Sequence, residues 1–141
     1  PVAALDAPVA RAITALLDRL RQEHRMGLIF ISHDIGTVAQ LCQRIAVMYL
    51  GQVVEAGPAD QVLSAPRHPY TQGLLSAIPQ PNPGRRPPPP MLGGEPASPI
   101  DPAPGCRLAP RCPYARDVCR SQTPALRGGM HRAACHFTAI D

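Results

Sequence analysis

The sequence contains no lysine and no tryptophan, and it has only two phenylalanines and three tyrosines. No hydrophobic run approaches the roughly 18 residues of a membrane-spanning helix, so we expect no such helix. All 14 cationic residues are arginines, a usage that reflects genomic base composition, so the net charge of +4 does not by itself indicate nucleic-acid binding. The scarcity of aromatic residues also argues against a surface on which bases stack.

Prolines are concentrated in one stretch, since 11 of the 19 lie between Pro79 and Pro104. A packed core is hard to build from such a stretch, which is typical of an extended linker. Six arginines balance six acidic residues before it, whereas eight arginines outnumber four acidic residues from Pro79 onward. We therefore predict one core plus an appendage. Because the chain opens on proline, we expect it to be a fragment or a processed piece.

The first third of the chain has the pattern of an α/β sheet domain. Asp6 and Pro8 are typical of a helix start, and Gly27 suits its left-handed end. Residues 28–31 are continuously apolar, which favours a strand covered on both faces, and apolar residues recur at helical spacing over 35–45. A helix that leads into such a strand implies a parallel neighbouring strand.

Shorter elements are predicted further along the chain. Two apolar segments flank Leu50, Gly51 and Gln52, which favours a β-hairpin with the glycine in its turn. Residues 58–63 can form one or two helical turns, and a short helix is predicted to begin near Pro69.

Three polar residues, Ser32, His33 and Asp34, directly follow the predicted strand. In open α/β sheets, ligands bind outside the carboxyl ends of the strands, so these side chains stand where chemistry occurs. The alternative is that Ser32 or Asp34 caps the next helix and His33 lies in a loop.

Two segments resemble the distal half of an ABC-transporter ATPase domain, "AALDAPVARAITALLDRL" and "GLIFISHDIGTVAQLCQRIAVMYLGQVVEAG". The resemblance implies that His33 is the switch histidine, which contacts the γ-phosphate of ATP bound with magnesium. It also implies that Ala4, Leu5 and Asp6 belong to the loop that faces a partner ATPase. Ala3 replaces the serine that is usual in this turn.

Several motifs of that family do not occur in residues 1–141. The sequence has no glycine-rich phosphate loop with its lysine, no Leu-Ser-Gly-Gly-Gln signature and no catalytic glutamate. Residues 1–141 alone are therefore predicted not to hydrolyse ATP.

Four of the five cysteines lie close together near the C-terminus, separated by five, six and fifteen residues: Cys106, Cys112, Cys119 and Cys135. Four interpretations compete: disulfides, zinc with His131 or His136 as a substitute ligand, an iron–sulfur cluster and four unrelated thiols. Nearby arginines can offset the charge of a thiolate site or form a solvated surface; these are Arg107, Arg111, Arg116 and Arg120. Cys42 is predicted to be a core residue.

The segments "RHPYTQGLLSAIP", "GCRLAPRCPYARDVCR" and "HRAACHF" resemble the C-terminal extension of oligopeptide and dipeptide importer ATPases. Several members of that family bind a [4Fe-4S] cluster through four cysteines, which implies this role for the four cysteines here. In contrast, we assign no chemistry to the His68–Thr71 motif, whose histidine and tyrosine are expected to pack and to start a helix.

The resemblance predicts four parts: the distal half of the ATPase domain (1–57), a helical extension (58–80), a Pro-rich linker (81–104) and a Cys-rich metal segment (105–141). It implies a subunit at the cytoplasmic face of the cell membrane that pairs with a second ATPase and two permeases. A solute-binding protein would deliver peptides, nickel or related solutes. The alternative is a stand-alone metal-binding or nucleic-acid-binding module, although no nucleic-acid partner is expected.

Overall fold

The computed structural model describes residues 6–78, 91–95 and 98–138. Its contacts divide the chain into two units, residues 1–43 and 44–141. Ala4, Leu5 and half of the predicted linker 81–104 lie outside the described residues, and the four-part division stays a prediction. No helix in the described part of the chain has both the length and the apolar character needed to cross a bilayer.

The first unit contains two helices, α1 (Ala7–Glu23) and α2 (Ile35–Leu41). As predicted, Asp6 caps α1, because its Oδ1 accepts a hydrogen bond from the Val9 N–H at 3.1 Å. The predicted end of α1 at Gly27 is wrong. Arg25 takes the left-handed conformation (φ 50°), and the Met26 N–H donates to the Arg21 carbonyl at 3.0 Å, which closes the helix in a Schellman motif.

The predicted strand at residues 28–31 does not form, and Ile29 and Ile31 are 91% and 85% exposed. A strand needs a neighbour for its N–H and C=O groups, and none of the described strands lies beside this segment in the sheet. The helix predicted over 35–45 is also too long. It ends at Leu41, Cys42 is extended, and Ile45 belongs to a strand instead.

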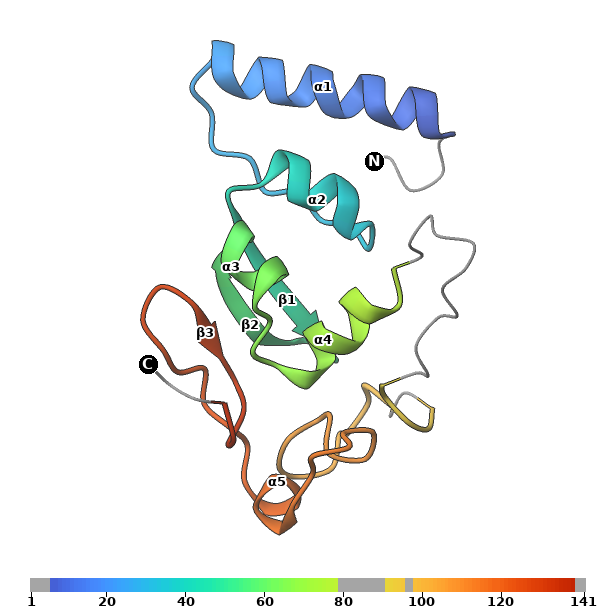
Figure 1. The fold of residues 1–141 in the computed structure, drawn as a ribbon, viewed down its shortest axis with the longest axis vertical. Helices are drawn as coiled ribbons and strands as arrows, with labels where there is room; N and C mark the ends of the chain where they lie inside the picture. The colour runs from blue at the N-terminus through green and yellow to red at the C-terminus, as the bar shows by residue number, and fades with distance from the viewer. Residues whose placement is uncertain (1–5, 79–90, 96–97, 139–141) are drawn as a thin grey trace. The chain divides into compact units, whose positions relative to one another are not determined.

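The second unit is built on the predicted hairpin, β1 (Arg44–Tyr49) and β2 (Gln52–Pro58) (Figure 1). Leu50 and Gly51 both have positive φ (45° and 78°), as a tight hairpin turn requires. A two-residue strand, β3 (Arg132–Ala133), pairs antiparallel with the other edge of β2. The fold is thus mixed α/β, with one antiparallel sheet of order β1-β2-β3 in the described residues.

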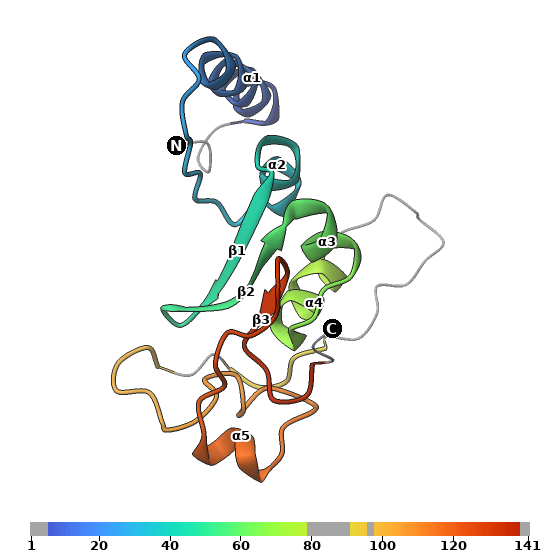
Figure 2. The ribbon, with the colours of Figure 1, turned by 90° about the vertical axis from the view of Figure 1, so that its left-hand side faces the viewer.

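Two helices follow the hairpin, α3 (Ala59–Ser64) and α4 (Pro69–Ser76), in agreement with the sequence prediction. Both lie on the same side of the sheet (Figure 2). The core of this unit consists of Tyr49, Val54 and Leu108, and Tyr70 packs its ring on Tyr49 with centroids 4.6 Å apart. Leu108 comes from the Cys-rich segment, so the hairpin and that segment share one core.

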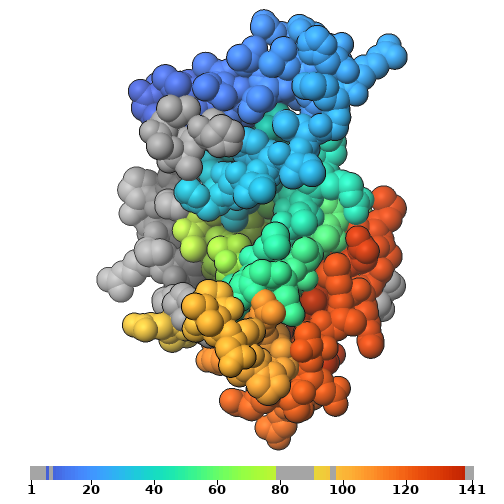
Figure 3. All heavy atoms as spheres, turned by 180° about the vertical axis from the view of Figure 1, so that it is seen from behind, coloured from blue at the N-terminus to red at the C-terminus, as the bar shows by residue number. Residues whose placement is uncertain are grey.

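The C-terminal segment returns to the hairpin after one short helix, α5 (Asp117–Ser121). In the space-filling view, its red and orange residues lie directly beside the green hairpin (Figure 3). The Ala134 N–H donates to the Val54 carbonyl at 2.8 Å, which extends the pairing beyond β3. This return brings Cys135 back to the region of the other three clustered cysteines.

Candidate functional site

His33 lies in the loop before α2, where its side chain is exposed. Asp34 caps α2, with Oδ1 accepting from the Gly36 N–H at 3.0 Å and Oδ2 accepting from the Thr37 hydroxyl at 2.5 Å. The Thr37 hydroxyl is the main cause that lowers the pKa of Asp34. Asp34 therefore caps the next helix, as the alternative interpretation of residues 32–34 expected. The His33 ring makes no hydrogen bond within the described residues, so it stays available to a ligand.

The four clustered cysteines line one small cavity in the second unit, together with His68 and His136. Burial raises the pKa of the Cys106 and Cys112 thiols, and the neighbouring cysteines raise it further. Their shared place in the lining of this cavity puts the four side chains around a common space. The set of donors is the one that thiophilic metals and iron–sulfur clusters use.

The four thiols line one cavity, but whether their positions suit a metal ion is a separate question. In the described ranges, no group of three or more His, Cys, Asp or Glu residues is arranged to hold a metal ion. The cavity volume is about 20 Å³. The donor types and their convergence therefore fit a thiolate centre, whereas the side-chain positions do not form one.

Local backbone contacts bring three of the cysteines together. The Cys106 N–H donates to the Cys119 carbonyl at 2.7 Å. Gly105 permits this approach, because it has φ 89° and a Cβ there would lie 2.4 Å from the Cys119 oxygen. Cys135 reaches the cavity from the C-terminal segment and also lines an open cleft of about 510 Å³. It thus lies between the enclosed cavity and solvent.

Three of the four nearby arginines have structural contacts. Arg107 donates to the Leu50 carbonyl in the hairpin turn, and Arg111 donates to the Gly93 carbonyl at 3.0 Å. The Arg116 guanidinium lies 4.3 Å from the centre of the Phe137 ring. These three arginines therefore help to hold the Cys-rich segment in place.

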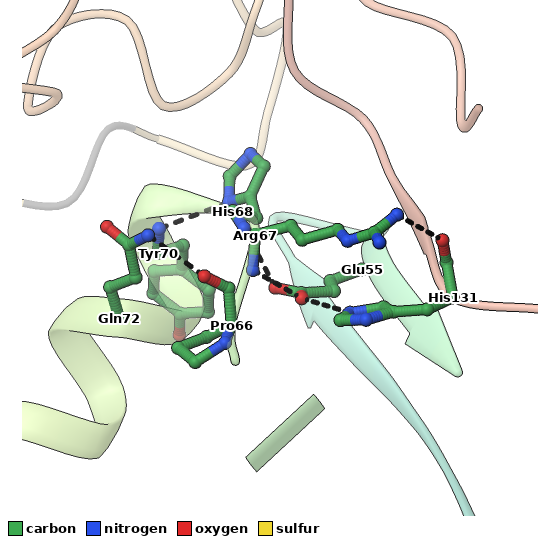
Figure 4. Close-up of polar contacts among 7 residues, drawn as sticks. All are labelled: Glu55, Pro66, Arg67, His68, Tyr70, Gln72 and His131. Carbon is green, nitrogen blue, oxygen red and sulfur yellow. Dashed lines mark hydrogen bonds and ion pairs between the residues drawn. The ribbon is translucent and has the colours of Figure 1, made fainter. Parts of the chain in front are cut away.

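The sequence analysis missed a buried polar cluster around Glu55, shown in Figure 4. The Glu55 side chain is fully buried, and its carboxylate accepts hydrogen bonds from the N–H groups of Arg67 (2.7 Å) and His68 (3.0 Å). Its Oε1 also lies 2.7 Å from Nε2 of His131. The available signal was an acidic residue inside the apolar run Val53–Ala56. His131, a possible zinc ligand by sequence, is bound to Glu55 and is absent from the cysteine cavity lining.

His68 starts α4, as the sequence analysis expected. Its Nδ1 accepts a hydrogen bond from the Tyr70 N–H at 3.1 Å, and only 1% of the residue is exposed. Burial lowers the pKa of His68 from 6.5 to about 4, although Glu55 and the Ala134 backbone act in the opposite direction. The imidazole is therefore neutral at physiological pH, as its acceptor role requires.

We predict that His68 makes the protein less stable in mild acid. The unfolded chain takes up a proton as the pH falls below 6.5, whereas the folded ring resists protonation until about pH 4. The free energy of unfolding should therefore fall by up to about 3 kcal/mol across this window. His68→Asn keeps an acceptor for the Tyr70 N–H and should flatten the decline, as measured by urea unfolding at several pH values. His24→Asn, at an exposed position, is the control; parallel curves for wild type and His68→Asn would contradict the prediction.

Comparison with known proteins finds similarity along nearly the whole chain. Residues 54–119 match the family model described as the C-terminal region of oligopeptide/dipeptide transporters. The chain is 45% identical over 140 residues to a probable peptide ABC transporter ATP-binding protein of Sinorhizobium fredii, covering 98% of this chain and 40% of that protein. It is 42% identical over 143 residues to the dipeptide transport ATP-binding protein DppD of Escherichia coli, covering 100% of this chain and 43% of that protein.

The chain spans about two fifths of the length of these relatives. The match extends over nearly the whole chain, so it includes the loop of His33, the hairpin and the four cysteines. Residues 54–119 therefore match the C-terminal region of the oligopeptide/dipeptide transporter family, and nearly the whole chain is similar to ABC ATP-binding proteins named for peptide or dipeptide transport.

Proposed function

We propose that this chain forms the C-terminal part of the ATP-hydrolysing subunit that energises peptide uptake by an ABC importer. The observation that carries the proposal is the 42–45% identity, over nearly the whole chain, to ATP-binding proteins named for peptide or dipeptide transport. In this proposal the subunit binds ATP and magnesium, pairs with a second ATPase and docks on two permeases at the cytoplasmic face of the membrane. The permeases and a solute-binding protein select the cargo.

In the proposed subunit, His33 donates a hydrogen bond to the γ-phosphate of ATP. Catalysis of phosphoryl transfer depends mainly on positioning and on neutralising charge, which a ring N–H at the phosphate supplies. The Asp34 cap supports this role, because it fixes the backbone next to His33 by two hydrogen bonds. Asp6, which caps α1, belongs with Ala4 and Leu5 to the loop that faces the partner ATPase.

The transport proposal is tested by uptake in cells. Deleting the gene of the whole subunit should abolish uptake of labelled dipeptides or oligopeptides, and the intact gene should restore it. Uptake of nickel ions, measured in the same cells, tests the other cargo class. Peptide uptake that survives the deletion, together with nucleic-acid binding by the purified protein, would instead support the stand-alone module.

We further propose that Cys106, Cys112, Cys119 and Cys135 hold a [4Fe-4S] cluster, with zinc as the alternative metal. What supports the proposal is that all four thiols line one cavity of the second unit. Metal ligation requires deprotonated thiols, so the raised pKa values of Cys106 and Cys112 mean that binding must release protons. When bound, the cluster would cross-link the Cys-rich segment, and nothing nearby indicates an electron-transfer partner.

A further inference from the structure

Glu55 has no role in the function proposed above, yet it is among the most completely buried side chains of the second unit. It lies on β2, the central strand of the sheet. An ionised carboxylate in the interior is costly unless hydrogen bonds satisfy it. Three donors do so here, and they come from two distant parts of the chain: the start of α4 and the C-terminal segment (Figure 4).

Two further features place His131 next to Glu55. The Arg67 guanidinium donates to the His131 carbonyl at 3.0 Å. Gly57 lies two residues after Glu55 on the same face of β2, and a Cβ at Gly57 would come within 3.1 Å of the His131 Cα. The absence of a side chain at Gly57 therefore makes room for His131. Glu55 and Gly57 on β2 thus fit His131 of the C-terminal segment.

His131 directly precedes β3, and β3 leads to Cys135. Ala133 pairs with Glu55, Arg132 pairs with Ala56, and the Ala134 N–H donates to the Val54 carbonyl. A strand of two residues has few ladder hydrogen bonds with which to fix its own register. The buried contact between His131 and Glu55 supplies a specific anchor at the point where β3 begins.

Cys135 depends on this anchor more than the other three cysteines do. Cys106, Cys112 and Cys119 lie within 14 residues of chain that is closed by local backbone hydrogen bonds, such as Cys106 N–H to Cys119 C=O. Cys135 stands sixteen positions beyond Cys119 and two residues after β3, and Nε2 of its neighbour His136 lies 3.0 Å from the Gln122 carbonyl. Among its connections to the sheet, the register of β3 on β2 helps to set the position of its sulfur.

We propose that Glu55 is a positioning residue for the four-cysteine site: by binding His131 it fixes β3 on β2 and holds Cys135 at the cavity that the other three cysteines line. The reason for placing Cys135 rests on the proposed metal site, but the placement itself does not require a bound metal. Through Glu55, the hairpin and the start of α4 help to determine where Cys135 lies.

The experiment measures the alkylation rate of each cysteine separately in the reduced, metal-free protein by iodoacetamide labelling and mass spectrometry. Glu55→Gln places an amide NH₂ where one of the three donors now points, so one hydrogen bond is replaced by a clash of donors. His131→Leu leaves the contacts of Glu55 with the Arg67 and His68 N–H groups in place and removes the donor that the imidazole supplies. Glu95→Gln, at an exposed residue of the same unit, is the control.

We expect the alkylation rate of Cys135 to rise about tenfold in Glu55→Gln and in His131→Leu, because local opening of the C-terminal segment becomes easier. The rates of Cys106 and Cys119 should stay within about twofold of wild type, as should all rates in Glu95→Gln. An unchanged Cys135 rate in His131→Leu would overturn the proposal. An equal rise at all four cysteines would overturn it too, since it would show that Glu55 only stabilises the whole unit.

A second measurement separates this inference from the metal site. Cobalt(II) bound by thiolates has absorption bands whose intensity rises with the number of thiolate ligands. Wild type should show the spectrum of four thiolates, and His131→Leu that of three. If wild type binds no cobalt, iron or zinc while Cys135 still becomes reactive in the variants, the metal proposal fails and the positioning role stands. A four-thiolate spectrum in both variants would overturn the positioning role.

Discussion

Replacing His33 by alanine in the full-length subunit is expected to lower ATP turnover by about 10²–10³-fold, the usual effect of removing one preorganised donor from a site where charge develops. In the loose transition state of phosphoryl transfer, charge is spread over the three equatorial oxygens of the γ-phosphoryl group, so a donor preorganised for that geometry stabilises the transition state more than bound ATP. The dissociation constant for ATP should therefore change only a few-fold. Steady-state ATPase rates and equilibrium binding of ATP measure the two effects separately.

The control for this prediction is His24→Ala, because His24 is also an exposed histidine of the first unit. Its replacement should leave ATP turnover unchanged. Asp34→Ala adds a further test, since it removes the cap that fixes the backbone next to His33 and should give an intermediate loss. Wild-type turnover in His33→Ala would show that this residue is not the switch histidine.

Features that depend on neighbouring residues could be predicted from the sequence. The hairpin was predictable because Gly51 takes positive φ between two apolar segments. The starts of α1 and α4 were predictable because Asp6 and His68 bond to N–H groups two or three residues away. In each case the decisive interaction lies within one turn of the chain.

Features that depend on distant partners could not be predicted in the same way. An apolar run such as residues 28–31 becomes a strand only when another strand supplies hydrogen bonds, and the described sheet supplies none there. Glu55 lies 76 positions from His131, and a glutamate in a strand usually faces solvent. The convergence of the four cysteines was inferred from their resemblance to a family pattern. In contrast, no residue near His131 in the sequence indicates its contact with Glu55.

Replacing any one of the four clustered cysteines by serine is expected to abolish metal binding by the C-terminal segment. Anaerobically purified wild-type protein should be brown and contain about four irons per chain, as the four-cysteine cluster type requires. Each Cys→Ser variant should be colourless and lack stoichiometric iron, because serine does not replace a thiolate ligand. Iron analysis and absorption spectra of the four variants provide the measurement, and Cys42→Ser is the control because Cys42 belongs to the other unit.

The same variants should loosen the segment itself. Few of its side chains are buried and apolar; among the described residues these are Leu108, Ala109, Cys119, Ala133 and Ala134. The unfolded segment has no preformed site, so a metal bound by the four thiols adds its binding free energy to the stability that these side chains supply. Proteolysis should therefore cut the segment much faster in the four variants than in wild type or Cys42→Ser. A colourless anaerobic wild-type protein with one zinc per chain would refute the iron assignment, whereas iron retained in all four variants would refute the cysteine ligands themselves.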